Sequence, residues 1–246
     1  MTLNACAEIV KSGDADRFLA AMAAPPAARA VLFPIYAMNV EISRAPWVTA
    51  EPMIAEIRLQ WWRDALAEIA AGQAPRRHEV VEPLAQVLDA EGARLLEPVI
   101  DTRRWEIARE PFVSEAQLLG HLAAGAGGLM WAAARTLGAT DEDAVRGVGL
   151  AGGIAAWLVA VPAFHAAGLE PLPDASDDAI KRLAQTGLDA LRPVGRAARP
   201  AALAAWEAGP VLKRAVAEPE RVEAGTLARP DGMRRLRLMR MTSLGR

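Results

Sequence analysis

Cysteine is almost absent from this chain, since Cys6 is the only one among 246 residues. A single thiol excludes an internal disulfide and any zinc site built on clustered cysteines. Histidine is also scarce, and His78, His121 and His165 lie far apart without the spacing of metal ligands. From these two residue types we therefore expect no metal site.

Strong net charge and an apolar run near the first residues are lacking too. The formal net charge is −2, so no overall field draws the chain to nucleic acid, and we predict no nucleic-acid partner. Residues 1–18 contain no apolar run of signal-peptide length. We therefore expect a cytoplasmic protein.

Strand patterns are missing, because no stretch combines sustained apolar–polar alternation with β-branched and aromatic residues. Apolar residues recur instead at three- and four-residue intervals, and the hydrophobic fraction of 52% is ample for a core. The sequence predicts an all-α fold. We expect helices over 3–24 (one or two), 27–44, 52–72, 82–91, 92–109, 114–137, 140–168, 176–191 and 200–217.

Several of these helices carry recognisable start signals. Ser12, Asp14 or Asp16 is expected to cap a helix near the N-terminus, and Ser176 a later one. Ser114, followed three residues on by Gln117, matches a capping box. We predict a single domain over 1–218 and an irregular, basic tail over 219–246.

The helix that begins at Pro52 has the clearest apolar periodicity. We expect its buried face to consist of Met53, Ile54, Ile57, Trp61, Ala65, Leu66 and Ile69. Two further runs, 116–134 and 147–169, contain no charged residue and are long enough to cross a membrane. Because glycine, alanine, histidine and Pro162 dilute them, we interpret both as central helices of an α-domain.

Three segments resemble the squalene/phytoene synthase family. They are IYAMNVEIS (35–43), PWVTAEPMIAEIRLQWWRDALAEI (46–69) and GVGLAGGIAAWLVAVPAFHAAGLEPLP (147–173). The likeness runs from about Asp16 to Pro173. The amino-acid sequence of these segments is most similar to the branch of the family that contains an assembly factor of mitochondrial respiratory complex I. The resemblance implies an isoprenoid synthase-like helical bundle around a central apolar cavity, in which the family's enzymes join two prenyl diphosphates head to head.

Those enzymes hold Mg²⁺ on two aspartate-rich motifs, because Mg²⁺ takes hard oxygen ligands. Where the first motif would stand, this chain has Ser43, Arg44 and Trp47; where the second would stand, 159–164 contains no carboxylate. Such side chains cannot rebuild a metal–diphosphate site. We therefore expect no catalytic residue, no metal and no cofactor, with Mg²⁺ required only if the chain is an active synthase after all.

Other acids are poor substitutes for the lost motifs. Glu56 and Asp64 are eight residues apart, about 12 Å along a helix, which is too far for one ion. We interpret these two, with Glu41, Asp101, Glu106 and Glu110, as surface or ion-paired carboxylates. Arg58 and Arg63 are candidates to pair with such acids across the bundle.

Six residues are candidates to line the cavity or its mouth. They are Tyr36, Arg44, Arg58, Trp61, Trp62 and Trp157. For the tryptophans, core packing and lining of a lipid cavity both stay open. For Arg44, a solvated loop position and metal-free phosphate binding both stay open. His121 and His165 are expected to be hydrogen-bonded core residues rather than catalytic bases.

The tail sequence GMRRLRLMRMTSLGR alternates arginine with leucine and methionine. It fits either a basic amphipath that contacts a membrane surface or acidic partner, or a frayed terminus.

Three functions follow from these observations. The first is a non-catalytic interaction or assembly protein. By resemblance, its partner is a respiratory complex I subunit or an assembly intermediate. We expect such a protein to lie at the periphery of the inner membrane. The second is a Mg²⁺-dependent head-to-head prenyl diphosphate synthase. The third is an isoprenoid- or lipid-binding protein.

Overall fold

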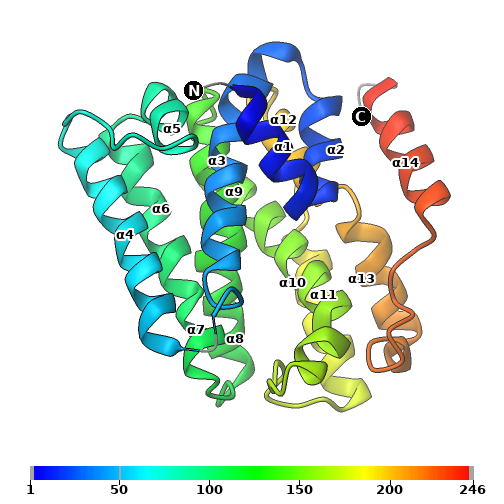
Figure 1. Cartoon of the computed structure of the whole chain (residues 1–246). Helices are drawn as coiled ribbons and strands as arrows, with labels where there is room; N and C mark the ends of the chain where they lie inside the picture. The colour runs from blue at the N-terminus through cyan, green and yellow to red at the C-terminus, as the bar shows by residue number, and fades with distance from the viewer. Residues whose placement is uncertain (1–2, 50, 244–246) are drawn as a thin grey trace.

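The computed structural model describes residues 3–49 and 51–243, and in these ranges the chain forms helices and no strand (Figure 1). The predicted all-α class is therefore confirmed. The helices are α1 (Leu3–Gly13), α2 (Ala15–Ala23), α3 (Pro26–Arg44), α4 (Pro52–Ala70), α5 (Val81–Val87), α6 (Ala90–Thr102), α7 (Arg104–Ala108), α8 (Glu115–Leu122), the π-helix η1 (Ala123–Gly127), α9 (Gly128–Thr136), α10 (Glu142–Ala166), α11 (Asp177–Ala190), α12 (Arg199–Ala202), the 3-10 turns η2 (Leu203–Ala205) and η3 (Pro219–Arg221), α13 (Ala208–Ala217) and α14 (Asp231–Ser243).

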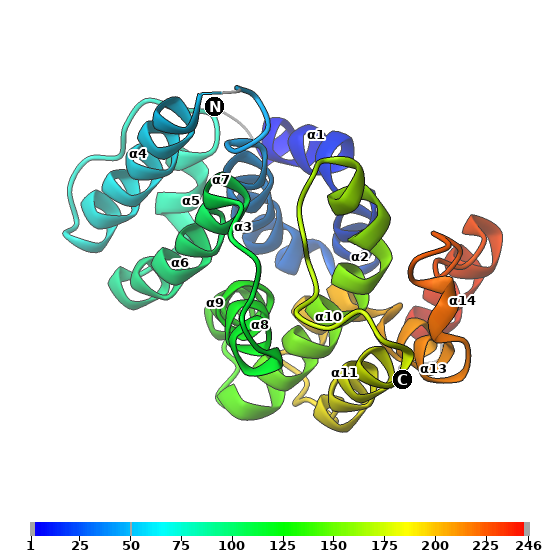
Figure 2. The ribbon, with the colours of Figure 1, turned by 90° about the horizontal axis from the view of Figure 1, so that it is seen from below.

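The helices pack around two adjoining apolar cores. The first includes Leu32 and Tyr36 of α3, Leu66 of α4 and Leu96 of α6. The second gathers the apolar faces of α8, α10, α11 and α13. Figures 1 and 2 both place α4 and α14 on opposite sides of the bundle, with α3 and α10 between them.

The predicted start signals are confirmed. Oδ1 of Asp14 accepts a hydrogen bond from the backbone N–H of Arg17 at 2.9 Å and caps α2. Ser114 caps α8 by accepting from the N–H of Gln117 at 3.2 Å, and Ser176 caps α11. These side chains satisfy donors that a helix leaves free in its first turn.

Three predicted helices are interrupted in the structure. The helix expected over 92–109 breaks at Arg103, between α6 and α7, and the one over 200–217 divides into α12, η2 and α13. The helix over 114–137 contains η1, where the small side chains of AAGAG allow close contact with neighbouring backbone. A Cβ on Gly127 would lie 3.3 Å from the carbonyl oxygen of Arg146.

The predicted buried face of α4 is partly wrong. Met53, Ile54 and Ile57 are exposed. Ala65, Leu66 and Ile69 are buried as predicted, and Trp61 is partly buried. The core receives Ala55, Leu59 and Trp62 in place of the three exposed residues. Apolar residues on two neighbouring faces satisfy the same periodicity here, and tertiary packing selects between them.

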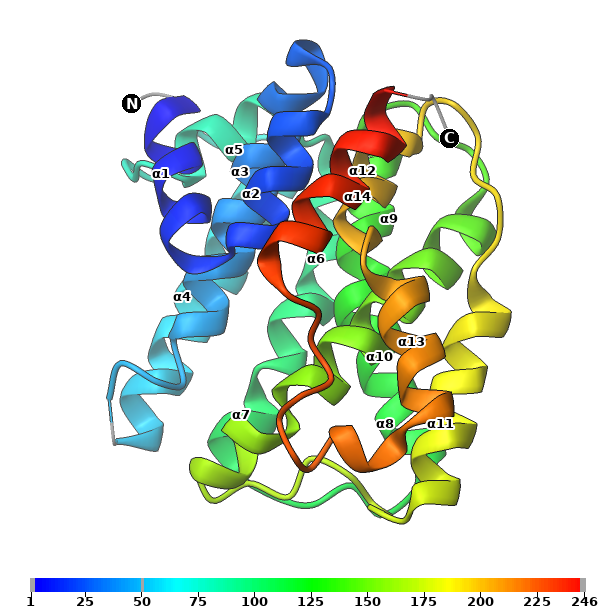
Figure 3. The same ribbon diagram turned by 90° about the vertical axis from the view of Figure 1, so that its right-hand side faces the viewer.

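The prediction of an irregular tail is also wrong for 231–243, because this segment forms α14. Leu238 is buried with Ala20 and Trp206, and Arg234 donates a hydrogen bond to Asp16 of α2. Figure 3 shows α14 on the side of the molecule that faces the viewer, where it packs against α2. The division into a domain over 1–218 and a tail over 219–246 stays a prediction, and residues 244–246 lie outside the described residues.

Within the described chain, α10 is the one helix long and apolar enough to cross a membrane by length and composition. It packs against η1, α9, α11 and α13 at the centre of the bundle. That placement matches the interpretation of 147–169 as a central helix. The other uncharged run, 116–134, bends through η1 and forms parts of α8 and α9.

Candidate functional site

A cavity of about 430 Å³ lies between the start of α2, the C-terminal half of α3, the π-helix η1 and α10. Its polar lining residues are Asp14 and Arg17 at the start of α2, Asn39, Ser43 and Arg44 of α3, and Arg103 and His121. Arg103 lies beside η1, with Nη2 3.7 Å from the position of a Cβ on Gly125. Small residues of η1 and α10, with Trp157 and Phe164, supply much of the apolar lining.

The two places where metal-binding motifs would stand meet at this cavity. Ser43, Arg44 and Trp47, at and beyond the end of α3, line it together with Trp157, Ala160 and Phe164 of α10. More than a hundred residues separate the two segments in sequence. The fold therefore brings the positions together, although their side chains have changed.

The residues present do not fit a Mg²⁺–diphosphate site. Among the lining residues that the structure describes, Asp14 alone carries a carboxylate, and Arg17 donates a hydrogen bond to it. Residues 3–49 and 51–243 contain no group of three or more histidine, cysteine, aspartate or glutamate side chains that could hold a metal ion. Mg²⁺ needs several hard oxygen ligands, whereas most of the charged side chains that line the cavity are arginines.

Several hydrogen-bond donors of the polar lining residues have weak acceptors or none within the described part of the chain. Arg44 makes two long contacts, from Nη1 to Glu41 at 3.5 Å and from Nη2 to the Ser12 hydroxyl at 3.3 Å. Arg103 donates from Nη1 to Oε1 of Glu106 at 3.0 Å. Asn39 is 8% exposed, and its amide makes no hydrogen bond within the described part of the chain.

Aromatic rings form part of the cavity lining. Trp157 donates from Nε1 to the carbonyl oxygen of Pro171 at 3.0 Å, and its ring centroid lies 4.6 Å from that of Phe164. His121 lies against the rings of Phe112 and Trp157. Burial, and secondarily the charge of Arg103, lower the pKa of His121 to about 4, so the imidazole is neutral near pH 7.

The structure places the six candidate residues in three different environments. Arg44 and Trp157 line the cavity. Tyr36 is buried, donates to the carbonyl oxygen of Ala201 at 3.4 Å and lines a small hollow of about 120 Å³ that shares a wall with the cavity.

Arg58, Trp61 and Trp62 do not line the cavity. The two tryptophan rings meet edge to face with their centroids 5.1 Å apart, and both contact His78 near the far end of α4. Arg58 is exposed on α4. Core packing is thus the interpretation that fits Trp62, which is buried in the first core, and Trp61, which packs against that core while partly buried.

Glu41, Glu56, Asp64, Asp101 and Glu106 take part in ion pairs and Glu110 is exposed, as expected of surface or ion-paired carboxylates. Arg104 donates to Glu56 at 3.0 Å and to Asp101 at 2.6 Å, and Arg63 also bonds Asp101. The expected pairing of Arg63 across the bundle is confirmed. The structure gives Arg58 no such partner among the residues it describes.

The prediction for His165 was wrong. Its ring is a third exposed and lies 3.4 Å from Glu223 and 3.9 Å from Glu170, at the end of α10. The short segment after α10 leaves this ring at the surface rather than in the core.

Sequence reasoning missed Arg17, Asn39 and Arg103 as cavity residues. Asn39 lies four residues before Ser43 on α3, so helical spacing alone could have placed it on the same face. Arg17 and Arg103 carried no such signal. Their positions depend on the turn before α2 and on the break between α6 and α7.

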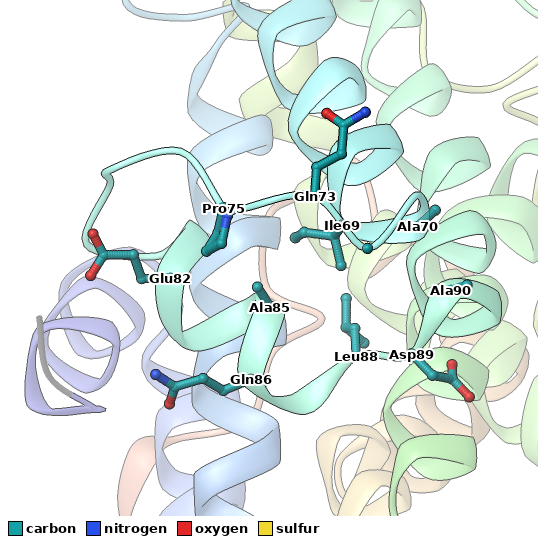
Figure 4. A pocket seen from close by; sticks show the side chains of 11 residues that line it. Ile69, Ala70, Gln73, Pro75, Glu82, Ala85, Gln86, Leu88, Asp89 and Ala90 are labelled. Atoms are coloured by element: carbon teal, nitrogen blue, oxygen red, sulfur yellow. The ribbon is translucent and has the colours of Figure 1, made fainter.

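A second, more open hollow of about 710 Å³ lies between the end of α4, α5 and the start of α6 (Figure 4). None of the six candidate residues lines it. Its lining includes two carboxylates, Glu82 and Asp89. Asp89 already caps α6 and pairs with Arg135 at 2.8 Å, so its carboxylate is not free to bind a metal ion.

Comparison with known proteins adds independent information. A sequence model of the squalene/phytoene synthase family matches residues 10–162. The human protein "NADH dehydrogenase (ubiquinone) complex I, assembly factor 6" is 23% identical over 164 residues, which cover 65% of this chain and 49% of that protein. The Drosophila melanogaster homologue is 31% identical over 107 residues, which cover 43% of this chain and 32% of that protein. The matched part thus spans half or less of these relatives.

Two solved structures share the fold. A dehydrosqualene synthase in complex with ligand superimposes with a TM-score of 0.74 at 12% identity, covering 99% of this chain and 95% of that one. Squalene synthase HpnC from Alicyclobacillus acidocaldarius gives 0.61 at 14% identity, covering 99% and 94%. The fold implied by the sequence motifs is confirmed.

Proposed function

The chain belongs to the squalene/phytoene synthase family, and from that premise we propose that it is a non-catalytic member that acts as an interaction factor in the assembly of respiratory complex I. One observation carries the non-catalytic part. The two motif positions meet across one cavity, yet they present Ser43, Arg44 and Trp47 on one side and Ala160 and Phe164 on the other. These groups cannot hold the magnesium that prenyl diphosphate ionisation requires.

The likeness to complex I assembly factors supports the partner part of the proposal. A surface feature of this chain supports it as well. Trp47, Val48, Met53, Ile54 and Ile57 are all exposed, in the loop after α3 and the first turns of α4. We call these five residues the mouth patch, because Trp47 and Val48 also line the cavity. Grouped exposed apolar side chains are typical of protein-interaction surfaces.

The partner we propose is a complex I subunit or an assembly intermediate that contains one. The test is a strain whose own copy of the gene is deleted, complemented with wild-type protein or with the double variant Met53→Ser/Ile57→Ser. We expect complex I activity of membranes to fall on deletion, to return with the wild type and to stay low with the double variant.

Met22→Ser is the matched control, because Met22 is an exposed methionine on α2, outside the mouth patch. This variant should restore complex I activity fully. Normal complex I activity in the deletion strain would overturn the assembly function. Full rescue by the double variant would overturn the role of the mouth patch.

An active prenyl diphosphate synthase is the competing function, because the fold and the cavity both persist. Purified protein with Mg²⁺ and farnesyl or geranylgeranyl diphosphate should release no diphosphate above the level without protein. Metal-dependent release that scales with protein concentration would overturn the non-catalytic proposal.

We also propose that the protein works in the cytoplasm, peripheral to the inner membrane. The outward side of α14 supports this proposal, since Met233, Leu236 and Met239 are exposed there beside Arg235 and Arg240. A basic helix with exposed apolar side chains suits a membrane surface. Arg234 and Arg237 face inward instead, toward Glu207.

A further inference from the structure

We infer that α14 is a reversible clasp, which lies on the bundle in the free protein and leaves it when the helix binds a membrane rich in anionic headgroups. The inference rests on the proposed membrane contact of α14. It adds that arginines on the inward side of the helix exchange carboxylates of the bundle for lipid phosphates, and that this exchange uncovers the surface beneath the helix.

Two arginines of α14 hold the helix on the bundle. Arg234 donates a hydrogen bond to Asp16 of α2, and its Nε lies 3.9 Å from Oε2 of Glu207. Nε of Arg237 donates to the carbonyl oxygen of Trp206 at 2.9 Å and lies 4.0 Å from Glu207. The side chains of Asp16 and Arg237 are 47% and 39% exposed, so these contacts are open to water. Ion pairs of this kind are weak, because salt and competing anions screen or replace them.

The apolar part of the contact is small. Among the side chains of α14 that the structure describes, Leu238 alone is buried, with Ala20 and Trp206, and Met241 packs beside them. A hollow of about 220 Å³ lies next to this contact, with Trp206 and Arg234 among its lining residues. The helix therefore leaves part of the surface beneath it unfilled, and a surface that buries more apolar area competes well with the bundle.

An anionic membrane is such a surface. The outward side of α14 exposes Met233, Leu236 and Met239 beside Arg235 and Arg240, so the helix carries four arginines and one carboxylate in total. On the bundle, only the two inward arginines meet carboxylates of other helices among the described residues. A membrane offers phosphates to all four arginines and acyl chains to the apolar side chains. A guanidinium also binds a phosphate through two parallel hydrogen bonds.

A short hinge precedes the helix. Leu227 is 1% exposed in the second core, so the chain is anchored there, and only residues 228–230 separate this anchor from α14. Arg229 in this segment bonds Glu207 at 2.7 and 3.0 Å. The movement is therefore limited to α14 and the hinge, while the rest of the bundle stays packed. It uncovers Ala20 of α2, which is buried with Leu238 in the docked state.

A thiol placed under α14 reports the movement. Ala20→Cys introduces it at a position that is 1% exposed, and the native Cys6 is 0% exposed in the first core. The full chain is treated with iodoacetamide, which is uncharged, and mass spectrometry of peptides follows the labelling of each thiol. We expect phosphatidylglycerol vesicles to raise the labelling rate of the introduced thiol at least about tenfold over the free protein, because labelling requires local opening. Phosphatidylcholine vesicles and inorganic phosphate should leave that rate unchanged.

Ala21→Cys is the matched control. Ala21 is the next residue of α2, is 0% exposed and belongs to the first core rather than to the contact with α14. A thiol there should keep its slow rate on phosphatidylglycerol vesicles. In the Ala20→Cys protein, adding Glu207→Gln should raise the rate without vesicles, because the arginines of α14 lose this carboxylate. Circular dichroism checks that each variant keeps its helices.

The outcomes separate this inference from the proposed membrane contact. Co-sedimentation with phosphatidylglycerol vesicles without faster labelling of Ala20→Cys would overturn the clasp and leave the membrane contact in place. Absence of co-sedimentation would overturn both. Three further results would overturn the clasp alone. They are equal acceleration in Ala21→Cys, equal acceleration by inorganic phosphate, and labelling of Ala20→Cys that is already fast in the free protein.

Discussion

Arg103 donates a hydrogen bond from Nη1 to Oε1 of Glu106 at 3.0 Å, where the Glu106 side chain is only 3% exposed. Arg103 is the single residue between α6 and α7, so the pair fixes the corner at which the chain enters the cavity wall. Burial raises the pKa of Glu106, and the charge of Arg103 opposes that rise. Oε2 of Glu106 remains buried without a partner.

The raised pKa of Glu106 predicts a pH dependence of stability. The folded protein keeps this proton to a higher pH than the unfolded chain, whose glutamates titrate near about 4.3. The stabilising contribution is therefore complete below that pH and is lost as pH rises through the folded pKa. In urea unfolding at a series of pH values, the wild type should lose stability relative to Glu106→Gln as pH rises from about 4.

Glu91→Gln is the control for this series, because the Glu91 side chain is 52% exposed and lies in an exposed pair with Arg94. Its curve should run parallel to that of the wild type. A constant difference between wild type and Glu106→Gln across the pH range would contradict the raised pKa.

The lowered pKa of His121 predicts a pH dependence of stability with the opposite sign. Its folded pKa of about 4 lies below the unfolded value of about 6.5, so the unfolded chain binds more protons between these values. Stability should rise with pH across this window by up to about 3 kcal/mol and stay level above it. His121→Phe should flatten the rise, since phenylalanine suits the rings of Phe112 and Trp157.

The measurement for His121 is urea unfolding between pH 4 and pH 7, with His165→Gln as the control, because the His165 ring is a third exposed. The control should keep the wild-type slope in this window. An unchanged slope in His121→Phe would show that other groups produce the pH dependence.

Much of the fold was predictable from local signals. Asp14, Ser114 and Ser176 each cap the helix that their sequence context indicated. The errors arose where local signals were ambiguous. The first turns of α4 carry two apolar stripes, and only contact with the rest of the bundle shows that Leu59 is buried and Met53 is not.

The candidate site was predictable only in part. The motif positions located Arg44 at the cavity, and the resemblance located Trp157 there. Arg103 could not have been placed, because a helix was expected to run straight through it. Its side chain reaches the cavity from the break between α6, which ends at Thr102, and α7, which begins at Arg104.

The close contact between α10 and η1 predicts a position that tolerates no side chain. A Cβ on Gly149 would lie 2.8 Å from the carbonyl oxygen of Ala126 and 2.8 Å from Cα of Gly127. Because both are backbone atoms, the helices must separate to admit it. Gly149→Ala should lower the free energy of unfolding by about 1–3 kcal/mol in urea titrations.

Gly120→Ala is the matched control for this contact. Gly120 lies on α8, and a Cβ there would meet no atom within 4 Å. Alanine in that helix should stabilise the protein by about 0.5–1 kcal/mol, because it restricts the unfolded chain. Equal effects of the two substitutions would contradict the tight crossing of α10 and η1.

The proposed membrane contact of α14 predicts a loss of vesicle binding. Met233→Ser/Leu236→Ser removes two exposed apolar side chains from the outward side of α14. We expect the fraction that co-sediments with phosphatidylglycerol vesicles to fall several-fold, since membrane affinity scales with buried apolar area. Met53→Ser is the control, because Met53 belongs to α4, which lies on the opposite side of the bundle from α14 (Figure 1). An equal loss in that control would assign the contact to the mouth patch.

The hydrogen bonds of Glu207 allow a prediction of how strongly α14 is held against the bundle. Its carboxylate is 13% exposed and accepts hydrogen bonds from Arg229 at 2.7 and 3.0 Å, with Arg234 3.9 Å away. Removing this charge leaves Arg229, which directly precedes α14, without its charged acceptor, whereas Arg234 keeps its hydrogen bonds to Asp16 and Asp231. Glu207→Gln should therefore raise the rate of tryptic cleavage within 229–240 roughly tenfold, because cleavage requires local opening.

Glu218→Gln is the matched control, because Glu218 pairs only with nearby Arg221 among the described residues. It removes the same charge from a position that does not contact α14, so cleavage within 229–240 should keep the wild-type rate. If Glu207→Gln also keeps that rate, burial of Leu238 against Ala20 and Trp206 is sufficient to hold the helix. In that case Leu238→Ala should release it, and the arginine–glutamate contacts only orient a helix that apolar packing has already fixed.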